Sequence, residues 1–379
     1  MTKKKDLSKH IDLVSRVRIE HTSYGDTYEA LSRAYDSIGH TATPLCLLIT
    51  GDTRTGKSTV VGDFLDQHVP KRVDHRLVRS VVYAVTPANA SVKSLLESLL
   101  RGLGDPFWNK GSQTNMTQRL LSMLDAVECR MIVLDEFQHL CDKGQKLSIH
   151  KTADWLKVLI EGRRYGLVAV GLPIAASVVN GNSQLASRFD AELRMPAFDW
   201  CCKTSAAEFR GILRQFQSEL EPFVLPNLSS AEMGLRIYLA TAGRIGLVAK
   251  LLDRAVRDAV YEGRLEIRLE NLATAYRSSI WFAPRFPVPG GPFGAAFEAL
   301  LTDAVHHSVF VSAGEEAVAD QSASVSVHGA RAGSSDGLAA APSKQRRHGT
   351  RASKGRNKSG PRLPRGEAGR VSRDLARAL

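Results

Sequence analysis

Short, continuous apolar runs alternate with segments of helical period between residues 41 and 200. An uninterrupted apolar run is typical of a strand that is buried on both faces of a parallel sheet. Such runs lie at residues 45–49, 81–85, 131–134 and 167–170. The segments between these runs have apolar side chains at helical spacing. They are residues 57–67, 91–100, 117–127 and 152–163. This alternation predicts a doubly wound α/β domain over residues 41–200.

The pattern changes on both sides of this domain. Residues 1–40 predict an N-terminal helical segment. Residues 204–220, 229–240, 243–261 and 269–281 are all helical in period without an intervening strand-like run, so a small all-helical domain is predicted over residues 201–284. Prolines and glycines then mark a linker, and the composition beyond residue 311 cannot bury a core. Residues 285–379 are therefore predicted to be a Pro/Gly linker and a disordered basic tail.

The positive charge of the chain is concentrated in this tail. The 379 residues include 51 Lys and Arg against 39 Asp and Glu, a net charge of +12. Residues 341–379 hold twelve of these cations and two acids, so the rest of the chain is close to neutral. A mobile polycation of this kind suits nucleic-acid phosphates, which it would contact without reading base sequence.

The cysteines and apolar runs argue against an extracellular or membrane protein. The five cysteines include no CxxC pair and do not form a disulfide framework. The apolar run at residues 166–179 contains Pro173 and is shorter than the roughly 18 residues that a membrane helix needs. No apolar segment of a secretory signal follows the basic N-terminus. We therefore expect a cytoplasmic protein with no membrane partner.

A loop between the first strand and first helix of the α/β domain has the chemistry of phosphate binding. Residues 51–58 match GxxxxGK[ST], the Walker A motif or P-loop, in full. Its backbone N–H groups and the helix N-terminus would face phosphate oxygens. Lys57 is placed to reach the β- and γ-phosphates, and the Ser58 hydroxyl to ligate Mg²⁺. The predicted nucleotide-binding residues are Gly51, Asp52, Thr53, Arg54, Thr55, Gly56, Lys57, Ser58 and Thr59.

Two carboxylates follow the apolar run at residues 131–134. In P-loop enzymes the first acid of such a Walker B motif supports Mg²⁺, which is the role predicted for Asp135. The second, Glu136, is placed to polarise the attacking water. The two motifs together predict ATP hydrolysis, with Ser58 and Asp135 at the metal and with Lys57 and Glu136 in catalysis.

Two arginines are further candidates for the catalytic site. Arg188 follows a helix-like segment and is predicted to be an arginine finger that reaches the site of a neighbouring subunit. The alternative is a surface arginine that pairs with Asp190 or Glu192. Arg244 begins a helix of the helical domain, from which it could fold over the nucleotide and contact the γ-phosphate. The alternative there is an ordinary arginine in a first helical turn.

With these features the chain resembles an AAA+ ATPase, and more closely the TniB/TnsC-type transposition ATPases, which are near relatives of helicase loaders and initiators. The similarity lies in residues 135–140, the basic stretch after them, and residues 170–175, 184–189 and 243–246. It implies a lid formed by the helical domain, and an ATP- and Mg²⁺-dependent homo-oligomer, ring or filament, on duplex DNA. It further implies a DDE transposase of the TniA/TnsB type and a TniQ-like targeting protein as partners, in the bacterial cytoplasm.

Other functions stay open at this point. AAA+ proteins often place a polar sensor, Asn or Thr, after the fourth strand, where this chain has Gly171 followed by Leu172 and Pro173. A nucleotide-gated DNA scaffold with little turnover is therefore one alternative, and a helicase loader is another. A P-loop kinase is a third, against which Glu136 and Arg188 argue, because a kinase needs no arginine from a neighbour.

A basic stretch after the Walker B motif is the candidate DNA contact of the body. It contains Lys143, Lys146, His150 and Lys151. A loop there could face a central channel in a ring or filament, and the alternative is a solvated surface loop.

Overall fold

The protein is described by a computed structural model over residues 7–38, 40, 45–88, 90–140, 146–160, 165–280 and 291–294, with the backbone alone for residues 146–150. The chain divides into two units, Met1–Ala323 and Ser324–Leu379. Every described residue lies in the first unit. The predicted basic tail lies outside the described residues, as does the predicted linker apart from residues 291–294.

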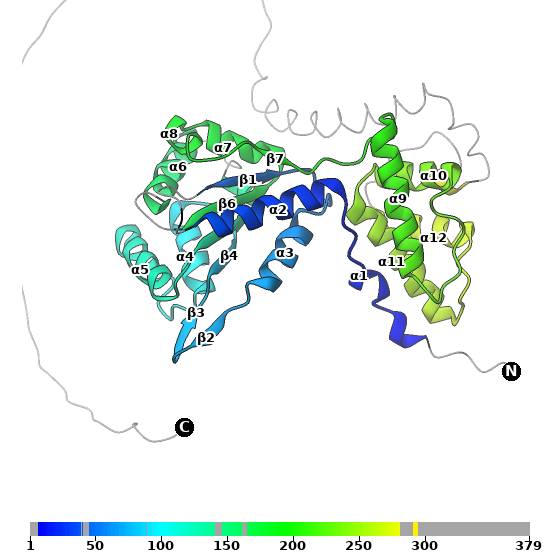
Figure 1. The fold of residues 1–379 in the computed structure, drawn as a ribbon, viewed down its shortest axis with the longest axis horizontal. Helices are drawn as coiled ribbons and strands as arrows, with labels where there is room; N and C mark the ends of the chain where they lie inside the picture. Colours follow the sequence, from blue (N-terminus) through cyan, green and yellow to red (C-terminus); the bar gives the residue numbers. More distant parts are fainter. Residues whose placement is uncertain are drawn as a thin grey trace, which may run out of the picture. The chain divides into compact units, whose positions relative to one another are not determined.

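Five parallel strands form the sheet of the α/β part (Figure 1). They are β1 (Leu47–Thr50), β4 (Val81–Val85), β5 (Met131–Asp135), β6 (Gly166–Gly171) and β7 (Leu193–Arg194), in the order β4-β5-β6-β1-β7. β6 lies between β1 and β5, with Ala169 opposite Leu48 and Val168 opposite Val133. Because all pairs are parallel, the loops after β1, β5 and β6 leave the same edge of the sheet, where ligands bind in open α/β folds.

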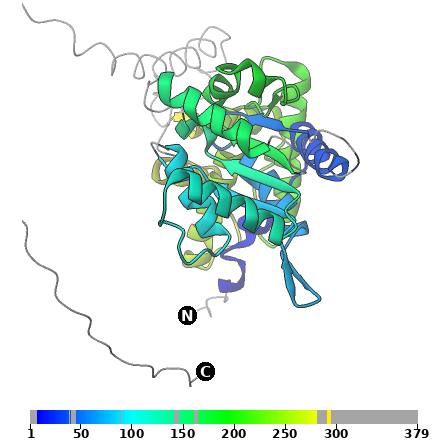
Figure 2. The ribbon, with the colours of Figure 1, turned by 90° about the vertical axis from the view of Figure 1, so that its left-hand side faces the viewer.

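Helices cover both faces of the sheet, because alternate residues of a strand point to opposite sides. On one face Ile49 and Val170 pack with Leu31 of α2 (Thr22–Ser37) and Phe64 of α3 (Lys57–Gln67). On the other face the strands pack against α4 (Val92–Gly102), α5 (Gln113–Ala126) and α6 (Lys146–Ile160); Figure 2 shows the layers from the side. The predicted doubly wound α/β fold is confirmed.

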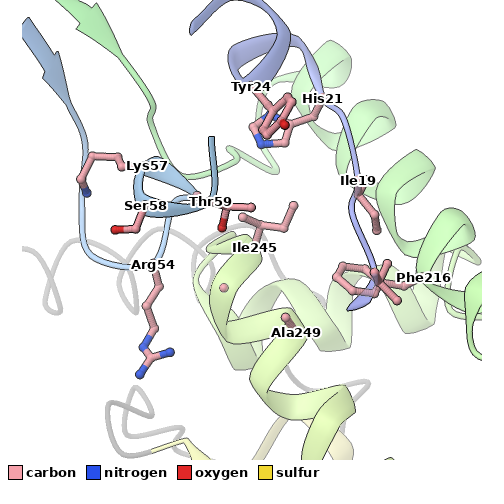
Figure 3. A pocket seen from close by; sticks show the side chains of 13 residues that line it. Ile19, His21, Tyr24, Arg54, Lys57, Ser58, Thr59, Phe216, Ile245 and Ala249 are labelled. Carbon is pink, nitrogen blue, oxygen red and sulfur yellow. The ribbon is translucent and has the colours of Figure 1, made fainter. Parts of the chain in front are cut away.

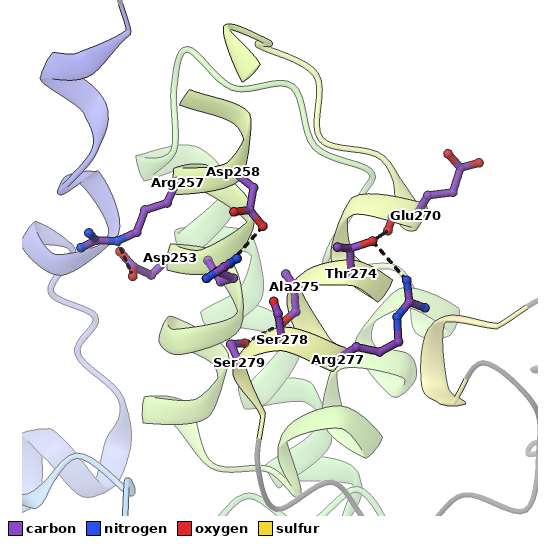
Figure 4. A network of polar contacts seen from close by, with 10 residues as sticks. Asp253, Arg257, Asp258, Glu270, Thr274, Ala275, Arg277, Ser278 and Ser279 are labelled. Carbon is purple, nitrogen blue, oxygen red and sulfur yellow. Dashed lines mark hydrogen bonds and ion pairs between the residues drawn. The ribbon is translucent and has the colours of Figure 1, made fainter. Parts of the chain in front are cut away.

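The helices after the sheet surround a core of their own. They are α9 (Lys203–Glu219), α10 (Ala231–Thr241), α11 (Ile245–Glu262) and α12 (Leu269–Ser279), followed by the 3-10 turn η4 (Gly291–Phe293). Phe209, Val248 and Leu272 are fully buried in this core. On the polar side of α11, Arg257 and Arg254 form ion pairs one turn along the helix, with Asp253 (2.8 Å) and Asp258 (3.0 Å), which Figure 4 shows. Such i,i+4 pairs support an exposed helical face.

The N-terminal segment contributes to the core of the helical part and to the core on one face of the sheet. The short elements η1 (Ser8–His10) and α1 (Leu13–Arg16) lie on the helical part, where Leu7 and Val14 are buried. Helix α2 belongs instead to the sheet, through Leu31 and Ala34. Residues 17–21 connect the two and pass beside the P-loop. The division into domains at residues 40, 200 and 284 stays a prediction.

Several short elements were not expected from the sequence. β2 (Lys71–Val73) and β3 (Arg76–Val78) form an antiparallel hairpin, and α7 (Ala176–Asn180) precedes β7. The helix-like segment predicted before Arg188 is the short helix α8 (Ser183–Ala186). The hairpin turns at Asp74 and His75, whose φ values of 47° and 66° are those for which Asn-Gly is the usual signal. Among the described helices, none has the length and hydropathy of a membrane span.

Candidate nucleotide-binding site

The P-loop has the geometry of a phosphate cradle. It runs from the end of β1 to the first turn of α3, and Gly56, with φ of 102°, is the N-cap of that helix. The Gly51 N–H donates to the Gly171 carbonyl (3.2 Å), and a Cβ at Gly51 would lie 2.2 Å from the Met195 carbonyl oxygen. Glycine is therefore required at position 51. The open N-terminus of α3 favours an anion.

Lys57 is held on the loop by backbone carbonyls. Its Nζ donates to the carbonyls of Gly51 (2.7 Å) and Asp52 (2.6 Å), and the side chain is only 9% exposed. Burial lowers the pKa of Lys57, an effect that the nearby carboxylates, with Glu136 first among them, oppose. Ser58 and Thr59, which come next in α3, are exposed, so their hydroxyls are accessible to a ligand.

The remaining P-loop residues take different positions. Thr55 is buried and its hydroxyl donates to the Asp52 carbonyl (3.0 Å), which stabilises the turn. Asp52, Thr53 and Arg54 are exposed, and Arg54 has a φ of 64°.

Asp135, the last residue of β5, and Glu136, which follows it, lie close enough to Lys57 to act on its charge. Asp135 is buried: its Oδ1 accepts a hydrogen bond from the Glu136 N–H (2.8 Å) and its Oδ2 one from the Tyr83 hydroxyl (3.0 Å). Burial and the charge of Asp135 raise the pKa of Tyr83, so the phenol stays a donor at neutral pH. Glu136 is exposed and has a φ of 53°, which is uncommon for a residue other than glycine.

Arg244 comes to the P-loop from the helical part. It is the N-cap of α11, and its Nη2 lies 3.8 Å from Asp52 Oδ2. Its Nε is buried and has no hydrogen-bond partner among the described residues. Two residues further on, the Gly246 N–H donates to the Arg54 carbonyl (2.9 Å). The helical part thus contacts the loop directly, as a lid over it would.

Arg188 does not lie at the P-loop of its own chain. It follows α8, and the next residue, Phe189, bridges to Cys46 before the start of β1. The P-loop follows the other end of that strand. The charge of Arg188 acts on Cys46. Of the two arginines, only Arg244 therefore lies at the nucleotide site of its own subunit. The position of Arg188 is compatible with a role in the site of a neighbouring subunit.

A pocket of about 320 Å³ lies beside the P-loop. Gly56, Lys57, Ser58 and Thr59 line one side, and Figure 3 shows apolar side chains from three other segments around it. These are Ile19 from the N-terminal segment, Phe216 of α9, and Ile245 and Ala249 of α11, with His21 and Tyr24 above them. A mainly apolar hollow next to a phosphate cradle has the size and character of a site for a nucleotide base.

Sequence reasoning missed this pocket. Ile245 adjoins the Gly243-Arg244 pair that the sequence singled out, but Ile19 and Phe216 have no motif and come together only in the fold. Burial lowers the pKa of His21, against the charge of Glu208, so the imidazole at this pocket is uncharged at neutral pH. The ring stands edge-on to Phe198 (centroids 5.5 Å apart).

The predicted basic DNA contact is only partly described. Lys143 lies outside the described residues, and for Lys146 and His150 the backbone alone is described, in α6. Lys151 is exposed and lies near Lys93 and Ser91, at the N-terminus of α4. The contact stays a prediction.

The residues of the site fit a nucleoside triphosphate and Mg²⁺. The cradle at Gly51 and Gly56, the ammonium of Lys57 and the unsatisfied Nε of Arg244 suit phosphate oxygens. Mg²⁺ prefers oxygen ligands and keeps several waters, which the accessible Ser58 hydroxyl and the fixed Asp135 carboxylate provide for. When bound, the metal would neutralise phosphate charge.

The strand order, the P-loop after β1 and the two acids at the end of β5 define a P-loop ATPase of the AAA+ class. Residues 13–199 match the TniB family, described as "Bacterial TniB protein", and this part of the chain belongs to that family. The predicted resemblance is confirmed. A search of curated proteins found no match.

Solved structures share the fold. ORC1 of Aeropyrum pernix, solved in complex with DNA, has a TM-score of 0.52 and 18% identity, covering 71% of this chain and 69% of that chain. ORC2 of the same organism, in its ADPNP-ADP complexes, has a TM-score of 0.50 and 18% identity, covering 72% of each chain. Cdc6p of Pyrobaculum aerophilum has a TM-score of 0.51 and 16% identity, covering 71% of each chain. At these identities the similarity concerns the fold alone.

Proposed function

We propose that this TniB-family protein is an ATP-dependent, DNA-binding regulator of transposition. ATP binding assembles it into a homo-oligomer on duplex DNA, where it recruits a DDE transposase and responds to a TniQ-like partner. Hydrolysis then releases or resets the assembly. The observation that carries the nucleotide part is the convergence of Lys57, Glu136 and Arg244 on one loop beside a base-sized pocket. Family membership supports the transposition part, and the DNA complex of a protein with the same fold supports the DNA part.

In this proposal each residue of the site has a distinct task. Lys57 moves from the loop carbonyls to the β- and γ-phosphates, and Ser58 and Asp135 hold Mg²⁺ directly or through water. Glu136 accepts a proton from the water that attacks the γ-phosphate. Arg244 contacts the γ-phosphate from the lid, and Arg188 reaches the site of the neighbouring subunit.

ATPase rates with and without duplex DNA test the proposal. We expect DNA to stimulate turnover in the wild-type chain, Lys57→Ala to abolish nucleotide binding, and Glu136→Gln to bind ATP but hydrolyse it at least about 100-fold more slowly. Glu136→Gln should therefore accumulate the DNA-bound assembly, visible by electron microscopy. Lys203→Ala, which changes an exposed lysine of α9, is the matched control and should behave as wild type.

The outcomes separate the alternatives. ATP-dependent DNA binding without turnover would show the nucleotide-gated scaffold instead. Turnover that ignores DNA and needs a phosphate acceptor would show a kinase. ATP-dependent assembly of Lys57→Ala would refute the P-loop assignment itself.

A further inference from the structure

The side chain of Gln138 fills the space that position 171 leaves open. Gln138 lies in the 3-10 turn η2 (Phe137–Leu140), which begins directly after Glu136, and is 5% exposed. A Cβ at Gly171 would lie 2.5 Å from Gln138 Oε1 and 3.2 Å from the Phe137 nitrogen. A side chain at position 171 and the observed position of Gln138 therefore exclude each other.

The amide of Gln138 is hydrogen-bonded at both of its ends. Its Oε1 accepts from the Leu172 N–H (3.0 Å), and its Nε2 donates to Glu136 Oε2. A backbone N–H only donates and a carboxylate only accepts, so the two partners fix which end of the amide is oxygen and which is nitrogen. Gln138 thereby joins the carboxylate after β5 to the first residue after β6.

Glu136 is a residue whose orientation needs such support. Its side chain is exposed and its backbone has a positive φ of 53°, a conformation that persists only where surrounding contacts hold it. The bond from Gln138 occupies one carboxylate oxygen and leaves the other to accept a proton from water. A correctly aimed base matters, because a misplacement of about 1 Å can cost about 100-fold in rate.

We propose that Gln138 is a positioning residue for ATP hydrolysis: it orients the Glu136 carboxylate and supplies, from the turn after β5, the polar group that is missing at Gly171. This inference rests on the proposed function, since it assigns Gln138 a task in the same hydrolysis. It also means that the glycine at position 171 does not by itself indicate a chain that turns ATP over poorly.

Gln138→Met tests this directly, because it keeps the length of the side chain and removes both hydrogen bonds. We expect kcat to fall about 10- to 100-fold, with the Kd for ATP within about threefold of wild type, because no residue of the phosphate cradle changes. The matched control is Gln217→Met in α9, which removes a bond of the same kind, from the Leu228 N–H (2.9 Å), and should leave kcat unchanged.

Two further variants separate positioning from general destabilisation. In a Glu136→Gln background, Gln138→Met should cause no additional loss in single-turnover rate, because it acts through Glu136. Gly171→Ala should displace the amide and lower kcat in the wild-type background, but not when combined with Gln138→Met. Gly171→Ala therefore tests the inference even if Gln138→Met does not fold.

Three results would overturn the inference. They are an unchanged kcat in both Gln138→Met and Gly171→Ala, a loss in Gln138→Met that is fully additive with Glu136→Gln, or an equal loss in the Gln217→Met control. In each case the proposed function would still hold if the wild-type chain hydrolyses ATP and Lys57→Ala does not. A wild-type chain without turnover would refute the proposed hydrolysis and this inference together.

Discussion

A single methyl group at Gly246 should loosen the contact between the lid and the P-loop. The Gly246 N–H donates to the Arg54 carbonyl, and a Cβ at Gly246 would lie 3.0 Å from both the Cβ and the carbonyl oxygen of Arg54. Contacts this short require the neighbour to shift by a few tenths of an ångström. Gly246→Ala therefore pushes the first turn of α11 away from the loop.

The size of the effect follows from two opposing contributions. Replacing a helical glycine by alanine stabilises by about 0.5–1 kcal/mol, whereas weakening the 2.9 Å hydrogen bond and its close contacts costs about 1 kcal/mol or more. The two nearly cancel in Gly246→Ala. Gly211→Ala in α9 is the matched control, since a Cβ there meets no atom within 4 Å. Gly211→Ala should therefore show the whole stabilisation of the glycine-to-alanine change, which is a rise of about 1–4 °C in Tm.

Nucleotide affinity should separate the two variants more clearly than stability. Ile245 and Ala249 line the pocket and Arg244 pairs with Asp52, so all three move with the first turns of α11. We expect the Kd for ADP to rise about tenfold in Gly246→Ala, equivalent to about 1.4 kcal/mol, and to stay unchanged in Gly211→Ala. Isothermal titration calorimetry and thermal unfolding measure both quantities. If Gly246→Ala gains stability and binds ADP as Gly211→Ala does, the lid contact is not part of the site.

Three other predictions concern the loop, the finger and the tail. Lys57→Ala should abolish the rise in Tm that ATP causes while leaving the nucleotide-free Tm unchanged or higher, because the ammonium it removes is buried at a cost in desolvation; a variant that fails to fold without nucleotide would contradict this. Arg188→Ala should lose turnover, and mixing it with Lys57→Ala subunits should restore some, since one mixed interface carries both intact halves; no rescue would count against a role in trans. Truncation after Val311 should leave ATP binding intact and flatten the slope of log DNA affinity against log salt by about 0.9 for each DNA phosphate that the tail neutralises in the full chain; an unchanged slope would show that the tail does not touch DNA.

The elements that the sequence predicted well are those with a continuous apolar run or with apolar residues at regular helical spacing. The apolar run at residues 81–85 is β4 itself, and the helical pattern at residues 57–67 is α3. The run at residues 45–49 missed the limits of β1 by one or two residues, because Cys46 forms only an isolated bridge. The β2–β3 hairpin and the two-residue strand β7 were not predicted, since neither has a buried run nor a glycine-containing turn to mark it.

The candidate site divides in the same way. The P-loop residues follow one another in the sequence, and so do Asp135 and Glu136 at the end of β5, so each motif contains the chemistry that the geometry shows. In the sequence Gln138 is only one residue of the Walker B stretch, and Ile19 and Phe216 belong to no motif, because the importance of all three depends on what the fold places opposite them. The missing side chain at Gly171 was visible in the sequence. The residue that fills its space was not, because it comes from a different strand connection.

The contacts at the loop indicate how a nucleotide would act on the lid. Lys57 is bonded to the carbonyls of Gly51 and Asp52, and Arg244 is paired with the Asp52 carboxylate. A triphosphate competes for both cations with groups of the protein, so its binding must exchange these contacts for phosphate contacts. A ligand shifts a conformational equilibrium only by its difference in affinity for the two states. Arg244 is the N-cap of α11, so replacing its contact with Asp52 by a contact with phosphate depends on the position of the lid. The affinity for a triphosphate therefore differs between lid positions. Arg244 is proposed to contact the γ-phosphate, which is the group that hydrolysis removes.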